Sequence, residues 1–290
     1  MIDWTILAPA AFFAGMVDAV VGGGGLIQIP VLLGQFPQTA IPTLFGTNKL
    51  SSIAGTGAAL WRYTRSVRIP WLVVLPGTAA ALVGAWAGAA LVAWLPRETM
   101  RPLVVVLMIA VALYTFMRKD FGVQGRVLAH DAQPTIRALA IGSTVGFYDG
   151  FFGPGTGSFL IFLFIRLLGM DFLLASVSAK IVNVATNLAA IAFFVATGAV
   201  FWKAAAVMAV CNLLGSRVGT ALALRHGAAF IRKAADERLR AWIVFLRVKH
   251  TEDLMRGFMY QSEIQPSHRS RICEVLIHIG DIAVQVKFLN

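Results

Sequence analysis

The feature that most constrains the fold of this chain is a motif that occurs twice at one fixed offset. The recurring positions pair Gly15 with Gly146, Asp18 with Asp149, Gly22 with Gly153 and Gly24 with Gly155, 131 residues apart in each case. The same offset pairs Lys49 with Lys180, Trp71 with Trp202, Gly84 with Gly215 and Gly88 with Gly219. Because these identities fall on glycines and rare charges rather than on interchangeable aliphatic residues, they indicate an internal duplication.

Composition indicates where such a duplicated chain resides. Of its 290 residues 58% are hydrophobic and 13% charged, with a mean hydropathy of +0.75, whereas soluble domains carry about 25% charged residues. A soluble core cannot bury this much apolar surface, but a lipid bilayer can. An apolar chain of two related halves is typical of a transporter whose site lies where the halves meet. The first apolar run continues into the glycine motif, so we expect it to be retained rather than cleaved as a signal peptide.

The charge pattern excludes several other functions. The formal net charge is +11, but most basic residues before position 232 lie between apolar runs, as they do at the ends of membrane helices. No basic patch interleaved with aromatic residues occurs, so nucleic acid is not an expected partner. The two cysteines and five histidines lack metal-ligand spacing, and no enzyme motif is present. We therefore expect no catalytic residue, no cofactor and no metal.

Apolar runs long enough to cross a bilayer, about 20 residues, define the expected elements. In the first half they cover 5–21 with 24–34, as one element broken at Gly22 to Gly25, and then 44–61, 69–94 and 102–117. After a polar connector over 118–136, the second half repeats the order with 137–152 and 156–168, then 173–198 and 202–224. The predicted fold is an all-α multipass membrane protein of about seven spans, with membrane repeats over 1–117 and 137–232. Whether the broken elements cross fully or re-enter, and so whether the repeats are parallel or inverted, stays open.

The end of the chain departs from the repeat, because the fourth helix expected of the second half is missing. Residues 233–290 contain seven of the fourteen acidic residues. Four charged residues lie close together early in this segment, namely Asp236, Glu237, Arg238 and Arg240. Each would cost about 2–3 kcal/mol at the centre of a bilayer, so we predict that residues 234–290 lie outside the lipid. They are either a natural polar extension or a disrupted C-terminus.

The glycine breaks are the first candidates for a binding site. Four consecutive glycines at 22–25 disfavour a plain helix by about 1 kcal/mol each, and Gly153-Pro154-Gly155 does so more strongly because proline lacks an N–H. Backbone freed from helical bonding is tolerated at membrane depth only where it faces protein or a wet cavity. The N–H groups of a broken helix attract anions. We therefore place Gly22, Gly24, Gly153 and Gly155 at a substrate-binding break; the alternative is close helix packing through small residues.

Charged residues inside the spans are the second set of candidates. Each half has an Asp on its first element and a Lys near the start of its second, namely Asp18 with Lys49 and Asp149 with Lys180. Such residues usually face the protein interior or a cavity, and an Asp–Lys pair within each half would neutralise both charges. These are either structural ion pairs, or lysines that attract an anion beside an aspartate that tunes them or carries a proton. Lys49 is also near enough to a helix end to extend to the membrane surface.

Polar residues surround both lysines in the sequence and complete the candidate site. They are Thr47, Asn48, Ser51, Ser52 and Thr56 in the first half, and Ser178, Asn183, Thr186 and Asn187 in the second. Of these, Asn48 and Asn183 are the candidates for substrate contact. Asn183 and Asn187 share a helix face, and such groups either line a solute path or bond between helices.

Other intramembrane residues have plainer interpretations. The glycine pairs at 84 and 88 and at 215 and 219 are spaced for helix packing. Trp71 and Trp202 open their helices and fit an interfacial belt. Arg217 lies inside an apolar helix, where the first half has Trp86, and is a second-rank site candidate.

Four stretches resemble the sulfite exporter TauE/SafE family, which is also grouped with toluene sulfonate uptake permeases. They are AGMVDAVVGGGGLIQIPVLL, FGTNKLSSIAGTGAA, GFYDGFFGPGTGSF and SAKIVNVATNLAA, and the similarity covers about residues 8–232. The second half is particularly similar to the inner-membrane branch of unassigned substrate. The resemblance implies a bacterial inner-membrane permease of two four-helix repeats for sulfur-containing or organic anions such as sulfite, sulfoacetate or sulfonates. This chain departs from the family after Arg232.

On this interpretation the partners are a small anion and the lipid bilayer, transport is driven by an ion gradient, and assembly as a homo-oligomer is left open. Two other functions are compatible with the residues. One is an anion channel without coupling. The other is a non-transporting membrane component that binds a partner through its C-terminal tail.

Overall fold

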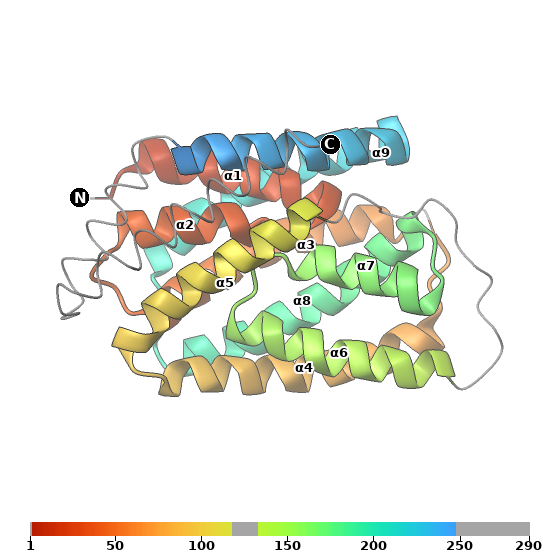
Figure 1. Ribbon diagram of the computed structural model, residues 1–290, viewed down its shortest axis with the longest axis horizontal. Helices are drawn as coiled ribbons and strands as arrows, with labels where there is room; N and C mark the ends of the chain where they lie inside the picture. Colours follow the sequence, from red (N-terminus) through yellow and green to blue (C-terminus); the bar gives the residue numbers. More distant parts are fainter. Residues whose placement is uncertain (1, 66, 118–132, 248–290) are drawn as a thin grey trace. The chain divides into compact units, whose positions relative to one another are not determined.

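The computed structural model describes residues 2–65, 67–117 and 133–247, and within these ranges the chain is α-helical and has no strand (Figure 1). The first-half helices are α1 (Trp4–Val21), α2 (Gly25–Gln35), α3 (Ile41–Tyr63), α4 (Trp71–Trp94) and α5 (Arg97–Met117). The remaining helices are α6 (Gln133–Phe151), α7 (Thr156–Leu168), α8 (Phe172–Ala196) and α9 (Trp202–Arg247). Residues Met1–Trp242 belong to one compact unit. The predicted all-α architecture is confirmed.

The helices begin at the positions that the duplication predicts. The starts of α2 and α7, of α3 and α8, and of α4 and α9 are each 131 residues apart. Short polar side chains cap two helix starts: the carboxylate of Asp3 accepts the N–H of Thr5 at the start of α1, and that of Asp171 accepts the N–H of Leu174 at the start of α8. A carboxylate in this position satisfies an amide that has no partner within the helix.

Length and hydropathy identify the membrane-spanning helices. Four helical segments are long and apolar enough to cross a bilayer, namely Trp4–Val21, Trp71–Trp94, Phe172–Ala196 and Trp202–Arg225. Three shorter apolar helices, Gly25–Gln35, Pro102–Val111 and Thr156–Leu168, include the second parts of both broken elements. Trp71 and Trp202, which open α4 and α9, are both more than half exposed, as expected of interfacial residues. The chain is thus a multipass membrane protein.

The two halves interlock through glycine-lined contacts. A Cβ added at Gly84 of α4 would lie 2.6 Å from the carbonyl oxygen of Ser143 on α6, and Gly88 meets the backbone of Phe147 on the same helix. In the same way, Gly215 and Gly219 of α9 lie directly against the backbone of Phe12 and Met16 on α1. The 131-residue offset relates the two sets of contacts, and Figure 1 shows α4 beside α6 and α9 beside α1. The packing interpretation of these glycines is confirmed, and α4 and α9 each pack on the first helix of the other half.

The two halves differ at the ends of the corresponding helices α4 and α9. In the first half α4 stops at Trp94, and Leu95 adopts an extended backbone (φ −75°, ψ 139°) before Pro96, as residues that precede proline do. The second half has Gly227 in place of Pro96, and α9 runs on to Arg247. The helix therefore continues past the predicted end at 224 into the polar segment. Residues 248–290 lie outside the described part of the chain, so the location of 234–290 relative to the lipid stays a prediction.

Candidate functional site

The two glycine breaks touch each other at the contact between the halves. Gly22 and Gly153, which occupy the same repeat position, have φ of +73° and +93°, a conformation that only glycine adopts readily. A Cβ added at Gly22 would lie 2.6 Å from the carbonyl carbon of Gly157. Across the same contact the hydroxyl of Ser158 donates to the carbonyl of Val21 at 2.8 Å. The start of α7 in the second half thus packs on the end of α1 in the first.

At the first break, the carboxylate of Asp18 binds the backbone N–H groups at the start of α2. The carboxylate of Asp18 accepts the backbone N–H groups of Gly23 and Gly24 through Oδ1, at 3.0 and 3.1 Å. Its other oxygen, Oδ2, accepts the hydroxyl of Thr56 on α3 at 3.0 Å. A negative charge here also complements the positive end of α2. The N–H of Gly24 is therefore already bound to Asp18, and the assignment of Gly24 to a substrate-binding break stays a prediction.

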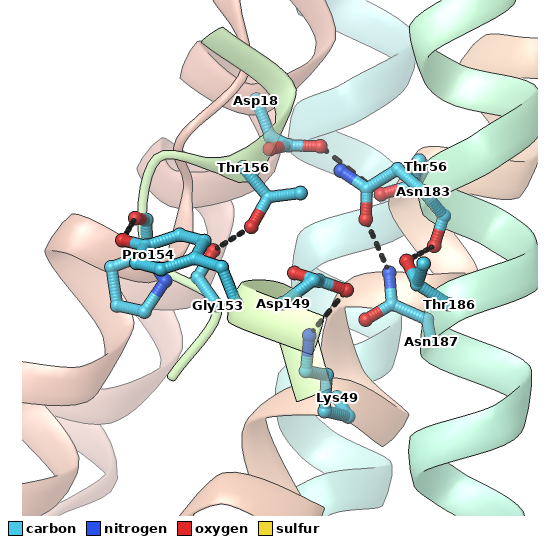
Figure 2. Close-up of polar contacts among 11 residues, drawn as sticks. Asp18, Lys49, Thr56, Asp149, Gly153, Pro154, Thr156, Asn183, Thr186 and Asn187 are labelled. Carbon is cyan, nitrogen blue, oxygen red and sulfur yellow. Dashed lines mark hydrogen bonds and ion pairs between the residues drawn. The ribbon is translucent and has the colours of Figure 1, made fainter. Parts of the chain in front are cut away.

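At the second break, side chains bind carbonyl groups instead. The Tyr148 hydroxyl donates to the carbonyl of Pro154. The Thr156 hydroxyl donates to the carbonyl of Gly153 at 2.7 Å (Figure 2). The residue that precedes α7 is Gly155, which adopts a left-handed conformation (φ 85°) and has no side chain to cap the helix. The amide end of α7 is therefore capped differently from that of α2.

The ion pair of the site joins the two halves. The ammonium of Lys49 lies 2.7 Å from Oδ2 of Asp149, and the two side chains are 4% and 2% exposed. A Cβ added at Gly153 would lie 2.9 Å from the same ammonium nitrogen, so Lys49 contacts the second break directly. The expectation that each half pairs its own Asp and Lys is wrong, because interlocking places α3 of the first half beside the break of the second. The burial of Lys49 also excludes its extension to the membrane surface.

Lys180 reaches across in the opposite direction but finds a different partner. Its ammonium donates to the backbone carbonyl of Asp18 at 3.0 Å and lies 5.6 Å from the ring centroid of Tyr63. Within the described part of the chain, Lys180 has no carboxylate at ion-pair distance. The predicted pairing of Lys180 with Asp149 is thus wrong, and Asp149 binds the other lysine. Lys180 is nonetheless buried, with 4% of its surface exposed.

The polar residues around the lysines, apart from the half-buried Ser52, are buried between the helices. Asn187 donates to the side chain of Asn183 at 2.9 Å, and the Thr186 hydroxyl donates to the backbone carbonyl of Asn183 (Figure 2). A Cβ added at Gly157 would lie 3.6 Å from the amide nitrogen of Asn183, which places Asn183 at the contact of the breaks. Asn48 is buried, and its Oδ1 has no hydrogen-bond partner among the described residues.

Gln28 is one of the buried polar residues that were missed in the sequence. Gln28 of α2 is fully buried and bonds to the hydroxyls of Ser51 and Ser52 on α3, at 3.2 and 3.4 Å. A single amide in an otherwise apolar stretch after the break was the available signal, but the second half has Phe159 there. Gln28 therefore lies outside the duplicated pattern that guided the selection of candidates.

The second-rank candidate Arg217 lies away from the buried charges of the two breaks. Arg217 lies at an exposed groove beside Arg62, whose guanidinium donates to the Arg217 carbonyl. Among the described residues no group of three or more His, Cys, Asp or Glu side chains is arranged to hold a metal ion.

Comparison with known proteins identifies related chains. The family described as Sulfite exporter TauE/SafE matches residues 7–235. "Probable membrane transporter protein ORF9" of Sinorhizobium sp is 37% identical over 226 residues, which cover 77% of this chain and 84% of the relative. "Probable membrane transporter protein YfcA" of Escherichia coli strain K12 is 34% identical over 78% of this chain and 83% of its own. A "Probable membrane transporter protein" of Haemophilus influenzae is 32% identical over 78% and 88%. No solved structure matches.

Proposed function

Because the chain belongs to the sulfite exporter TauE/SafE family, we propose that it is a permease that carries a small anion across the bacterial inner membrane. Membrane transport is the activity for which its relatives are named. The proposed substrates are small sulfur-containing or organic anions, of the sulfite, sulfonate or sulfoacetate type. An anion is favoured by the two buried lysines where the halves meet.

The observation that carries this proposal is the unequal neutralisation of the two lysines. Lys49 is in contact with a carboxylate, whereas Lys180 has a main-chain carbonyl as its acceptor. A buried ammonium is unfavourable unless charge or hydrogen bonds compensate it. A small anion would supply the missing compensation at Lys180. In this proposal Lys180 binds the substrate, and the pair of Lys49 and Asp149 holds the halves together.

The start of α7 offers further donors for the same anion. Asn183, three residues after Lys180 on α8, lies beside Gly157 in the first turn of α7. Residues three apart share one face of a helix, so Lys180 and Asn183 face the break together. The N-terminus of a helix favours negative charge. We therefore assign the substrate to the space around Lys180, Asn183 and the amide end of α7.

Charge balance favours coupling to a cation. The four charges at the breaks, Asp18, Lys49, Asp149 and Lys180, sum to zero, so a bound anion leaves the site negative. Moving one net charge against a membrane potential of about 100 mV costs about 2.3 kcal/mol. A co-transported cation, or a proton on one of the aspartates, would remove that cost. Transport driven by an ion gradient follows from this reasoning.

Transport into vesicles tests the proposal. Purified protein in proteoliposomes is assayed for uptake and counterflow of sulfite, thiosulfate, sulfonates, sulfoacetate and simple carboxylates. Wild type should accumulate at least one of these anions under an imposed ion gradient, and Lys180→Gln should abolish accumulation. The matched control is Lys203→Gln, which changes an exposed lysine of α9 and should transport normally. Flux without counterflow would indicate an uncoupled channel, and flux unaffected by Lys180→Gln would refute the site.

A further inference from the structure

A groove on the outside of the molecule contains two arginines that the transport site does not use. It lies between α3 and α9, has a volume of about 520 Å³, and is lined by Ala58, Trp61, Arg62 and Arg217. The Arg62 guanidinium donates to the backbone carbonyl of Arg217 at 3.2 Å, so one arginine tethers the two helices across the groove. The volume is within the range of small-molecule sites, about 300–1,000 Å³.

The groove opens toward lipid. Arg217 lies in a stripe of exposed apolar residues on α9 that includes Val210, Leu214 and Val218. These positions recur at three- and four-residue intervals and so form one helix face. Because residues Trp202–Arg225 form an apolar segment long enough to cross the bilayer, this exposed face contacts lipid. Trp61, at the opposite edge of the groove, is 60% exposed.

The groove also lies close to the membrane surface. Trp61 and Arg62 are in the last turn of α3, which ends at Tyr63. The Arg65 guanidinium, just after the helix, is 3.9 Å from the ring centroid of Trp61. Tryptophan and basic residues at the end of a membrane helix mark the level of the lipid headgroups. Within the described part of the chain none of the three guanidinium groups, those of Arg62, Arg65 and Arg217, forms an ion pair with an acidic side chain.

The other half of the molecule shows that packing does not require these arginines. By the 131-residue offset, Arg62 corresponds to Phe193 and Arg217 to Trp86. The rings of Trp86 and Phe193 are in edge-to-face contact, with centroids 5.5 Å apart. The same contact between helices is therefore made by two aromatic rings in one half and by two arginines in the other. Only the arginine version offers charge to the lipid surface.

We propose that the groove formed by Trp61, Arg62 and Arg217 binds the headgroup of an anionic phospholipid such as phosphatidylglycerol. Guanidinium groups bind phosphate oxygens through paired, charge-assisted hydrogen bonds. Trp61 lies where the glycerol and the first acyl carbons meet the protein. A zwitterionic lipid is disfavoured because its own cation would lie among the three arginines. This site is separate from the proposed transport site, so it can be tested without a known substrate.

Lipid binding to the purified protein tests the proposal. Delipidated protein in neutral detergent is titrated with phosphatidylglycerol or phosphatidylcholine of equal chain length, and bound lipid is counted by native mass spectrometry. Wild type should bind one phosphatidylglycerol about tenfold more tightly than phosphatidylcholine, the difference expected for loss of a charged hydrogen-bonded contact. The matched control Arg166→Gln, an exposed arginine of α7, should keep this preference.

The informative variant combines Arg62→Phe with Arg217→Trp, which installs the aromatic pair of the other half. Because that pair already packs in this fold, the variant should fold, and elution as a single species checks this. It should lose the preference for phosphatidylglycerol. If it does not fold, Arg217→Gln alone serves, and it should weaken the preference by about tenfold. Unchanged preference in a folded variant overturns the proposal. So does equal competition by soluble glycerol 3-phosphate, which would indicate a free-phosphate site.

Discussion

The two glycine breaks have the same sequence pattern but use their aspartates differently. Asp18 binds the amides of Gly23 and Gly24 in its own half, whereas Asp149 binds Lys49 of the other half. Consequently Lys49 forms an ion pair with a carboxylate, whereas Lys180 donates to a main-chain carbonyl. Two copies of one motif thus become a capped break and an ion-paired break.

A single residue accounts for much of this difference. Asp18 accepts the N–H of Gly23, and the residue at that position in the second half is Pro154. Proline has no N–H, so Asp149 lacks the donor that Asp18 uses. Its carboxylate is therefore available to the ammonium of Lys49, which interlocking of the halves brings to 2.7 Å.

The largest effect is expected from removing the charge of Asp149. Asp149→Asn leaves the buried ammonium of Lys49 unpaired, which should destabilise the fold by about 3–5 kcal/mol. Combining it with Lys49→Met should restore most of the loss, because removing both members of a buried pair can be nearly neutral. Unfolding in detergent, followed by circular dichroism, measures each single variant and the double. A double variant as unstable as Asp149→Asn would contradict the pairing.

The second-largest loss of stability is expected from disturbing the contact between the two glycine breaks. Gly22→Ala places a Cβ where φ is +73° and where the backbone of Gly157 lies within 3 Å. It should lower the free energy of unfolding by about 1–3 kcal/mol. The control is Gly57→Ala in the middle of α3, where a Cβ meets nothing within 4 Å, and it should stabilise by about 0.5–1 kcal/mol. Similar thermal stabilities of the two variants would show that the breaks do not pack as described.

Lys180→Gln tests whether the lysine without a carboxylate binds the anion. We expect a stability loss of about 1 kcal/mol, since one neutral acceptor is affected, but anion binding weakened at least about tenfold. Isothermal titration with the anion identified in the vesicle assay measures the binding. If stability falls by as much as in Asp149→Asn while the residual binding is normal, Lys180 is a structural residue.

The smallest effect is expected at Asp18. Asparagine caps helices about as well as aspartate, so Asp18→Asn keeps an acceptor for Gly23 and Gly24 and should cost less than about 1 kcal/mol. The loss in free energy of unfolding would then be several-fold smaller for Asp18→Asn than for Asp149→Asn. Equal losses in Asp18→Asn and Asp149→Asn would remove the distinction between the two breaks.

Much of the architecture could be predicted from the sequence, because it depends on local chemistry. Apolar runs of sufficient length predicted membrane helices, and glycine clusters with Pro154 predicted where two of them break. Spacing of small residues predicted the packing at Gly84 and Gly215. Those patterns act within one helix or at one contact, and the helix boundaries at Thr156, Phe172 and Trp202 follow them. The duplication also identified the four charged positions.

Tertiary structure alone decided how those positions combine. The offset relates Asp18 to Asp149 and Lys49 to Lys180, but it does not say which lysine meets which aspartate. That depends on interlocking, which places α3 of one half beside the break of the other and carries Lys49 across to Asp149. The same applies to Arg217, whose neighbours come from α3. An ion pair or a hydrogen bond forms only at contact distance, so the partners of these charges follow from the packing of the helices rather than from their separation in the chain.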